Sequence, residues 1–281
     1  MSLLLLLACL ASAQDWSQLS RDINRFLPSQ GSAAGVSLEP GMSWYWQLKG
    51  RIQAPQPAVK VYDVDLFDAA PGFAGPPGSV KVCYFSAGSL EMDDYRDCSR
   101  PAVAVSKNRR RQSRKIPASA VGARMRGWSE ECWLDIRDEQ VFRVMEERLD
   151  MAAAAGCAAV EPDNIDGYSH ASGFGLSSDD TLAFLRRLAE AAHARGLKIG
   201  SKNADDIASR LQPFTDFAVV ERCEEHDECG KYESFIRARK PVFQAEYTGY
   251  DDAKCARARA RRFSLVFFNE ALDGTVFQPC R

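Results

Sequence analysis

Three carboxylic acids follow a short apolar run near the middle of the chain. Glu161, Asp163 and Asp166 come directly after residues 158–160, with Pro162 and Gly167 among them. Because proline cannot donate to a strand ladder and glycine permits a tight turn, a buried parallel strand is predicted to end here. Two carboxyl groups that flank one bond can act as acid and nucleophile in hydrolysis. The alternative is a loop whose acids cap the next helix.

Polar side chains also end the other apolar runs of the chain. The pattern predicts eight strands, at 44–48, 59–66, 80–86, 132–136, from 158, 198–203, 217–223 and 242–247. If these strands are parallel, their C-terminal ends open at one mouth, where barrel enzymes carry out their chemistry. The polar side chains expected at that mouth are those of Asp65, Tyr84, Asp135, Asp163, Lys202, Asn203, Glu221 and Glu246.

Aromatic residues are expected at the same mouth, among them Trp46 and Tyr247. Sugars need polar partners at their edges and aromatic faces for their C–H surfaces. A mouth that combines several acids, one lysine, an asparagine and aromatic rings therefore predicts a carbohydrate site.

Helical patterns separate the later strands. Apolar residues repeat at helical spacing before Gly156 and between Ser177 and Gly196, and shorter amphipathic pieces cover 232–236 and 255–263. Strand and helix thus alternate from residue 132 onward. The chain of 281 residues, 46% of them hydrophobic, therefore fits an α/β protein with one domain, a (β/α)8 TIM barrel over 41–281.

Two connections depart from this pattern. Residues 69–79 are too rich in proline and glycine to form a regular helix. Residues 100–126 form a loop insertion with a basic run at 107–115. Such a run is usually a solvated loop; the alternatives are a polyanion site and a processing site.

Composition and motifs exclude several function classes. A formal net charge of -2 gives no reason to expect a nucleic acid or a membrane as partner, and no apolar run is long enough to span a bilayer. There is no Gly-rich nucleotide motif. Only three histidines occur, none placed for a Ser-His-Asp or Cys-His site, and the clustered acids lack zinc-like histidine spacing. We expect no metal.

The N-terminus and the cysteines indicate secretion. Residues 3–10 are apolar and precede Ala-Ser-Ala, so 1–13 is predicted to be a signal peptide and 14–40 an N-terminal arm. Removing Cys9 leaves eight cysteines, an even number. We expect the pairs Cys223–Cys229, Cys255–Cys280 and Cys98–Cys132, with Cys83 and Cys157 as buried free thiols. A zinc site at Cys223, His226 and Cys229 is a weaker alternative because no second ligand pair follows.

The ordered motifs of the chain resemble those of one enzyme family. They are Trp-Tyr-Trp-Gln-Leu, Tyr-Asp-Val-Asp-Leu-Phe-Asp, Cys-Tyr-Phe-Ser-Ala-Gly-Ser-Leu-Glu, Trp-Leu-Asp-Ile-Arg, Glu-Pro-Asp-Asn-Ile-Asp-Gly-Tyr, Ser-Lys-Asn, Glu-Arg-Cys and Val-Phe-Gln-Ala-Glu-Tyr. From Trp44 to Tyr247 the sequence resembles glycoside hydrolase family 114, the endo-α-1,4-polygalactosaminidases. The resemblance implies a barrel, no cofactor, hydrolysis of α-1,4-linked galactosamine polymers, and a catalytic pair at Asp163 and Glu221.

The roles within this pair are an expectation. A retaining mechanism would use Asp163 as nucleophile and Glu221 as general acid and then base, although the reverse assignment stays open. Neighbouring acids such as Glu246 are expected to help Glu221 hold a proton by like-charge repulsion. Arg222 and Ser201 depart from the family pattern, but Arg222 is predicted to point away from the mouth.

The substrate-binding side chains are expected to be those of Trp46, Asp65, Tyr84, Asp135, Asn164, Asp166, Lys202, Asn203, Glu246 and Tyr247. Asp65, Asp135, Asp166 and Glu246 would bind the ammonium group of deacetylated galactosamine, unless Asp135 instead pairs with Arg137 or Lys202. We expect a monomer whose partner is a polysaccharide. The alternatives are a hydrolase of another α-galactosyl glycan, an inactive carbohydrate-binding barrel and a metal-dependent hydrolase.

Overall fold

The computed structural model describes residues 37–56, 58–91, 98 and 115–280. The predicted signal peptide, residues 14–36 of the predicted arm and the basic residues 107–114 lie outside these ranges. Among the described residues, no helix has both the length and the apolar character needed to cross a membrane.

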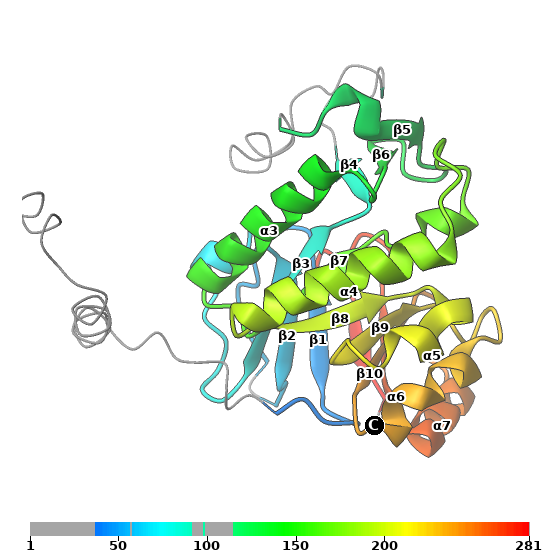
Figure 1. Cartoon of the computed structure of the whole chain (residues 1–281). Coiled ribbons are helices and arrows are strands. Elements are labelled where there is room, and N and C mark those ends of the chain that lie inside the picture. The colour runs from blue at the N-terminus through cyan, green and yellow to red at the C-terminus, as the bar shows by residue number, and fades with distance from the viewer. Residues whose placement is uncertain (1–36, 57, 92–97, 99–114, 281) are drawn as a thin grey trace, which may run out of the picture. The chain divides into compact units, whose positions relative to one another are not determined.

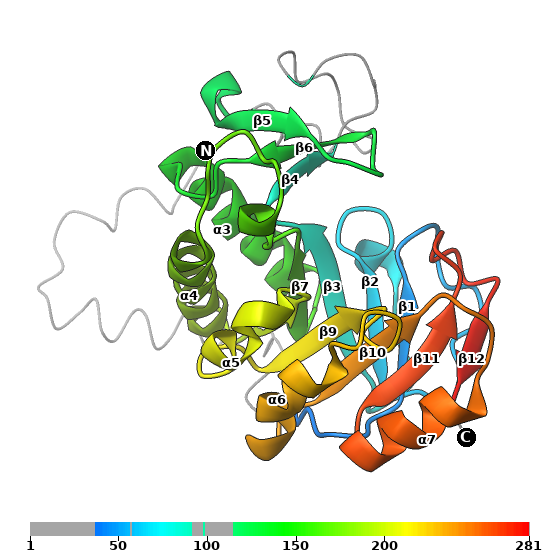
Figure 2. The ribbon, with the colours of Figure 1, turned by 90° about the vertical axis from the view of Figure 1, so that its right-hand side faces the viewer.

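Eight parallel strands form the main sheet, and a ninth strand pairs antiparallel with its last member. The sheet is curled: the indole nitrogen of Trp44, on the first strand, donates a hydrogen bond to the carbonyl of Ser264, on the eighth, at 2.7 Å. The predicted α/β barrel with one domain is therefore confirmed (Figure 2). In sheet order the strands are β1 (Trp44–Gln47), β2 (Val61–Asp65), β3 (Val80–Ser86), β7 (Ala159–Asp163), β8 (Lys198–Lys202), β9 (Phe217–Glu221), β10 (Val242–Glu246), β11 (Ser264–Phe268) and β12 (Phe277–Pro279).

One of the predicted barrel strands is wrong, and one barrel strand was missed. The run at 132–136 does not join the barrel: its residues lie in β6 (Glu131–Leu134), which pairs antiparallel with β4 (Ser89–Glu91) and β5 (Val121–Arg124) in a separate small sheet. The eighth parallel strand is β11, which follows the last helix and was not predicted. An apolar run shows that a strand is buried, but it does not show which sheet the strand joins.

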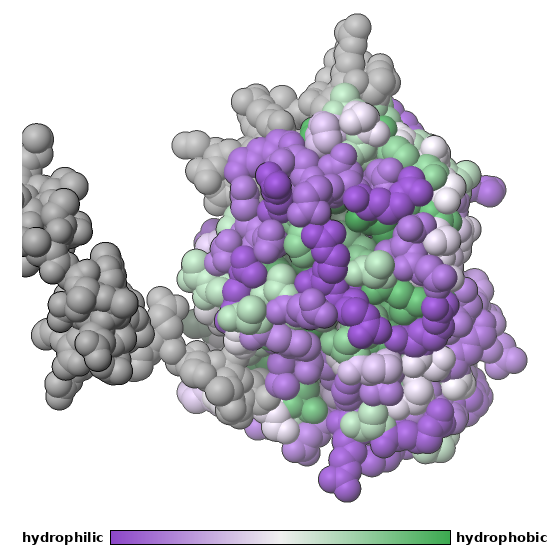
Figure 3. All heavy atoms as spheres, in the orientation of Figure 1, coloured by the Kyte–Doolittle hydropathy of each residue, from purple (hydrophilic) through white to green (hydrophobic). Residues whose placement is uncertain are grey.

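Two long helices cover one side of the barrel, α3 (Glu139–Ala154) and α4 (Ser178–Ala194) (Figure 1). Asp138 caps the first, and Ser177 with Asp180 forms a capping box at the start of the second, as the sequence predicted for Ser177. Their apolar faces pack on the outward side chains of β3, β7 and β8, such as Phe85, Val160 and Ile199. Their polar faces give the mixed, mostly hydrophilic surface seen in Figure 3.

Shorter helices cover the far side of the barrel. α5 (Ala208–Leu211), α6 (Glu233–Arg237) and α7 (Asp252–Arg261) lie along β9, β10 and β11 (Figure 2). The remaining helices of the described residues are single 3-10 turns: η2 (Ala70–Gly72), η3 (Ala118–Ala120), η4 (Gly167–Ser169), η5 (Asp205–Ile207) and η6 (Cys229–Tyr232).

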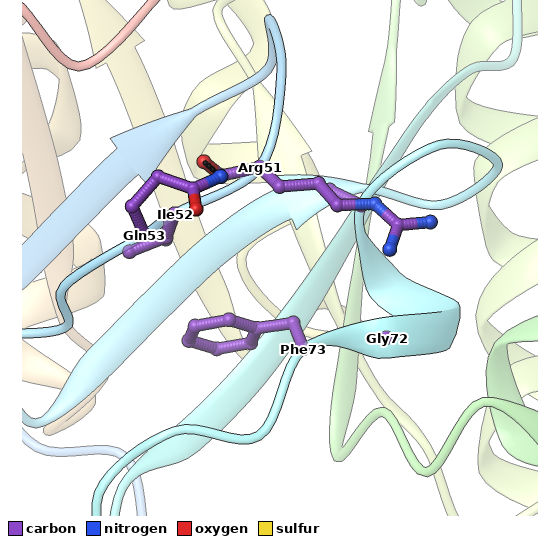
Figure 4. Close-up of a pocket in the computed structure, with 6 residues that line it drawn as sticks. Arg51, Ile52, Gln53, Gly72 and Phe73 are labelled. Atoms are coloured by element: carbon purple, nitrogen blue, oxygen red, sulfur yellow. Dashed lines mark hydrogen bonds between the residues drawn. The ribbon is translucent and has the colours of Figure 1, made fainter.

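The connection at 69–79 contains no α-helix, as predicted, and only the η2 turn. In its place an aromatic cluster covers the outer faces of β1 and β2: Tyr62 packs on Phe73 with ring centroids 5.2 Å apart, and Tyr45 packs on Phe277 at 4.8 Å. A small pocket opens over this cluster (Figure 4). Its lining consists of Arg51, Ile52, Gln53, Ala69, Gly72 and Phe73, none of which was predicted to act on substrate.

Four disulfides staple the fold. The predicted pairs Cys98–Cys132, Cys223–Cys229 and Cys255–Cys280 are confirmed. The prediction of free thiols at Cys83 and Cys157 is wrong, because these two residues are bonded to each other with Cα atoms 6.0 Å apart. β3 and β7 are neighbours in the sheet although 74 residues separate the two cysteines. Four disulfides are typical of proteins from oxidising compartments.

Candidate active site

Asp163 and Glu221 end β7 and β9, and β8 lies between these two strands. The last residue of β8 is Lys202, whose ammonium nitrogen lies 3.1 Å from Asp163 Oδ1 and 3.2 Å from Glu221 Oε2. Asp163 Oδ1 and Glu221 Oε2 can therefore be no further apart than the sum of these two distances. That total is shorter than the roughly 6.5–9.5 Å between the carboxyl groups of inverting glycosidases.

Strand alternation explains why these three side chains meet. Residues two apart on a strand share a face, so Asp163, Lys202 and Glu221 point to the same interior as Ala159, Gly200 and Val219. The next residues, Asn164, Asn203 and Arg222, have φ angles of 59°, 48° and 56°. Asparagine tolerates this left-handed conformation better than most residues, and it lets the chain turn sharply as soon as each functional side chain is placed.

Asp163 is held by two neighbours. The hydroxyl of Tyr84 donates to its Oδ2 at 2.9 Å, and the backbone N–H of Asn164 donates to its Oδ1 at 2.7 Å. The side-chain amide of Asn164 in turn donates to the hydroxyls of Ser86 and Ser89 and to the carboxyl of Glu131, at 2.9, 3.2 and 3.2 Å. Tyr84 and Asn164 thus orient the carboxylate rather than standing apart from it.

Glu221 is held by two more. The Asn203 amide donates to its Oε2 at 3.1 Å and accepts from its backbone N–H at 2.9 Å, while the Tyr247 hydroxyl donates to its Oε1. Burial raises the pKa of Glu221, but the charge of Lys202 and the hydrogen bonds from Tyr247 and Asn203 outweigh it, so the pKa lies below its usual value. The expectation that neighbouring acids help Glu221 keep its proton is therefore wrong for the free protein.

The interior beneath this pair contains two further acids. Glu161 Oε1 lies 3.5 Å from the Lys202 nitrogen, and the carboxyl of Asp63 interacts with that of Glu161. The Trp46 ring is also close, with the Lys202 nitrogen 4.9 Å from its centroid. Burial lowers the pKa of Lys202, but the surrounding carboxylates more than compensate and raise it well above its usual value. Lys202 is therefore a buried ammonium.

The sequence prediction missed Asp63, and it placed Glu161 among the acids at a strand end without giving it a catalytic or binding role, although a signal was present. Asp63 and Glu161 lie two residues before Asp65 and Asp163, on the same faces of β2 and β7. Strand alternation therefore places them one layer deeper in the same interior.

The four predicted binding acids have partners other than the pair. Asp65 accepts hydrogen bonds from the backbone N–H groups of Phe67 and Asp68, at 2.8 and 2.7 Å, and so caps its own turn. Asp135 binds the guanidinium of Arg137 at 2.8 Å, which was the alternative considered for it, and this bond holds the pKa of Asp135 below its usual value.

Glu246 lies on the outward face of β10, since its neighbours Ala245 and Tyr247 face the interior. Lys254 lies 3.1 Å from its Oε2, and the backbone N–H of Glu224 donates to its Oε1 at 3.0 Å. Asp166 follows β7 beside η4, where His170 Nε2 lies 3.1 Å from its Oδ2.

The two residues that follow Glu221 are Arg222, which forms ion pairs, and Cys223, which forms a disulfide. Cys223 and Cys229 are joined in a disulfide, so they are not available as thiolate ligands for zinc. The guanidinium of Arg222 pairs with Glu270 and with Glu225 and lies 4.9 Å from the centroid of the Tyr247 ring. It therefore packs on the residue that orients Glu221, and its charge is neutralised by glutamates outside the pair.

With this geometry established, comparison with known proteins identifies the family. The model of glycoside-hydrolase family GH114 matches residues 27–281. The chain belongs to this family. It is therefore a glycoside hydrolase, and the resemblance noted in the sequence is confirmed. No curated protein matches the chain.

Solved structures agree with this assignment. The chain is similar to Aspergillus fumigatus Ega3, solved in complex with galactosamine, with 33% identity and a TM-score of 0.76 over 88% of this chain and 98% of that one. The glycoside hydrolase domain of PelA from Pseudomonas aeruginosa has the same fold, with 15% identity and a TM-score of 0.57 over 85% of this GH114 chain and 98% of the PelA domain.

Proposed function

We propose that this GH114 hydrolase is a secreted enzyme that cleaves α-1,4-linked galactosamine-containing polysaccharide at internal bonds, with retention of configuration. Asp163 acts as the nucleophile, and Glu221 acts first as the general acid and then as the general base. The observation that carries the proposal is the placement of both carboxylates on one buried ammonium, that of Lys202.

The upper limit that Lys202 sets on the distance between Asp163 Oδ1 and Glu221 Oε2 supports retention. A retaining enzyme needs its carboxyl groups roughly 5–5.5 Å apart, so that one attacks the anomeric carbon while the other protonates the leaving oxygen. Lys202, Tyr84 and the Asn164 backbone all donate to or pair with Asp163, which fixes the direction of the oxygen that would attack the sugar. When the sugar–Asp163 bond is broken in the second step, Glu221 takes a proton from the attacking water.

The substrate class is supported by the likeness to Ega3, which was solved with galactosamine at 33% identity. Secretion is supported by the apolar N-terminal run, which we propose is a signal peptide cut after Ala13, and by four disulfides. We propose that 14–40 is an arm, that 41–281 is the catalytic domain, and that the enzyme acts as a monomer.

The test is incubation of the secreted protein with α-1,4-galactosamine polymers, followed by mass analysis of the products. Internal cleavage gives oligomers before monosaccharide, and NMR of the first product reports whether its anomeric configuration is that of the substrate. Asp163→Asn and Glu221→Gln should each remove at least about 99.9% of turnover while melting like the wild type. Normal activity in either variant would reject the catalytic pair.

The substrate itself is tested by a panel of polymers. Deacetylated and fully acetylated galactosamine oligomers are compared at low and high salt, because recognition of an ammonium group by carboxylates weakens as salt rises. Activity confined to α-galactosyl glycans without galactosamine would overturn the substrate class while leaving the hydrolase intact.

A further inference from the structure

Asp63 and Glu161 form a carboxyl pair in the barrel interior that the mechanism above does not use. Both side chains are completely buried, with no exposed surface. Within the described part of the chain, their four carboxyl oxygens accept no hydrogen bond from any other residue. They interact with each other, and Glu161 also lies 3.5 Å from the Lys202 nitrogen. Two buried carboxyls in contact cannot both be ionised without a large free-energy cost, so the pair holds a proton.

Lys202 connects this pair to the catalytic carboxylates. Its ammonium has three N–H donors, and three carboxylates lie around it: Glu161 at 3.5 Å, Asp163 at 3.1 Å and Glu221 at 3.2 Å. Glu161 and Glu221 are therefore separated by no more than two ion-pair distances across one buried cation. At that range in a protein interior, the charge on one carboxyl strongly affects proton binding by the other.

The free protein presents a difficulty for catalysis that this arrangement resolves. Glu221 must carry a proton to act as the general acid, yet its pKa lies below its usual value because Lys202 and two hydrogen bonds favour the ionised form. Burial, opposed by Lys202, raises the pKa of Glu161 to about 7. Glu161 thus binds one proton near neutral pH. When Glu161 releases this proton, the negative charge left on Glu161 favours binding of the proton by Glu221.

We propose that Glu161 is a positioning residue of this hydrolase, which shares Lys202 and a single proton with Glu221 and thereby allows Glu221 to be protonated near neutral pH. The proposal rests on the roles proposed above for Asp163 and Glu221. Asp63 keeps its own proton, stays neutral and donates a hydrogen bond to Glu161. The groups that face Glu161 are Asp63 from β2, Tyr84 from β3, Asp163 from its own strand, Lys202 from β8, Glu221 from β9 and Tyr247 after β10.

The experiment is the pH profile of kcat/KM for Glu161→Gln. This change keeps the shape of the side chain but removes the proton-sharing partner, so Glu221 can be protonated only at its own lowered pKa. The basic limb of the profile should move to lower pH by roughly one to two units or more. Glu161→Asp, which keeps the charge, should restore much of the limb. An unmoved limb, or one displaced to higher pH, overturns the proposal.

A matched control separates this effect from the loss of any buried acid. Glu246 is also completely buried, but it lies outside the barrel and pairs with Lys254. Glu246→Gln should leave the basic limb in place even if it lowers the melting temperature. A limb that moves equally in both variants would show a general effect of destabilisation and would also overturn the proposal.

A second measurement does not require the Glu161 variant to fold. Infrared titration of the wild type should show several protonated buried carboxylic acids at neutral pH, Glu131 among them. The difference spectrum against the near-isosteric variant Asp63→Asn should show the loss of one C=O band, that of Asp63. If the band survives in Asp63→Asn, the proton is not on Asp63 and the proposal fails. Failure of the proposed function is distinct, since it would appear as retained activity in Glu221→Gln.

Discussion

The ammonium of Lys202 lies 3.1 Å from the carboxylate of Asp163, on the neighbouring strand of the barrel. Lys202→Met keeps most of the side-chain volume but removes the charge that three carboxylates share. At least one of them must then bind a proton, because like charges this close cannot all stay ionised in a buried site. We expect kcat/KM to fall by at least about 100-fold.

Lys254→Met is the control for this substitution. Lys254 also pairs with a buried glutamate, Glu246, at 3.1 Å, but the pair lies outside the barrel interior. Its loss should destabilise the protein by a few kcal/mol, estimated from other buried ion pairs, and leave kcat/KM of the folded enzyme within about threefold of wild type. Wild-type activity in Lys202→Met would contradict the central role given to this cation.

Two tyrosine hydroxyls allow the two carboxyls proposed to be catalytic to be tested separately. The Tyr247 hydroxyl donates to Glu221 and lowers its pKa, so Tyr247→Phe should move the basic limb of the pH profile to higher pH. Tyr84→Phe removes the 2.9 Å bond to Asp163 and should lower kcat by about tenfold with the basic limb unchanged. Identical profiles for the two variants would argue against separate roles for the carboxyls.

Much of the site could be predicted because strand alternation and strand ends are visible in the sequence. Asp163, Lys202 and Glu221 end short apolar runs, and the runs proved to be parallel neighbours. Asp65 lies at a strand end as well, yet it caps its own turn. Glu246 ends its strand on the opposite face. The position of a residue at a strand end thus indicates how close its side chain lies to the mouth of the barrel. Whether that side chain points inward or outward depends on how many residues separate it from a residue on the same strand whose direction is known.

Other features depend on pairings that the sequence does not encode locally. Asp135 was assigned to the mouth because 132–136 was taken as a barrel strand, whereas its neighbours join an antiparallel sheet through β4 and β5. Cys83 and Cys157 were predicted to be free because each lies inside an apolar run, where a buried thiol is common, and only the pairing of β3 with β7 brings them together. Register and sheet order are non-local properties, and single-sequence patterns do not determine them.

The Cys83–Cys157 bridge should contribute more stability than the Cys223–Cys229 bridge. It closes a loop with a sequence separation of 74, compared with 6 for the shorter one. In the chain-entropy account, loops of these sizes correspond to about 4 and about 2 kcal/mol. Denaturant unfolding of Cys83→Ala/Cys157→Ala and of Cys223→Ala/Cys229→Ala measures the difference. A larger loss from the short bridge would indicate that local geometry near Glu221, rather than loop closure, dominates.

Glu131 should make the stability of the protein depend on pH. Burial and the neighbouring Glu91 raise its pKa to about 8, from 4.5 in an unfolded chain. Between these values the folded state holds a proton that the unfolded state has lost, so this contribution to stability is complete below about pH 4.5 and disappears as pH rises through about 8.

Glu131→Gln keeps an acceptor for Asn164 but has no proton to lose. Denaturant unfolding across this range should show a slope that is shallower than wild type by up to about 1.4 kcal/mol per pH unit. Glu139→Gln, at a side chain that is 55% exposed, should leave the slope unchanged. If Glu131→Gln retains the wild-type slope, the proton is held elsewhere in the fold.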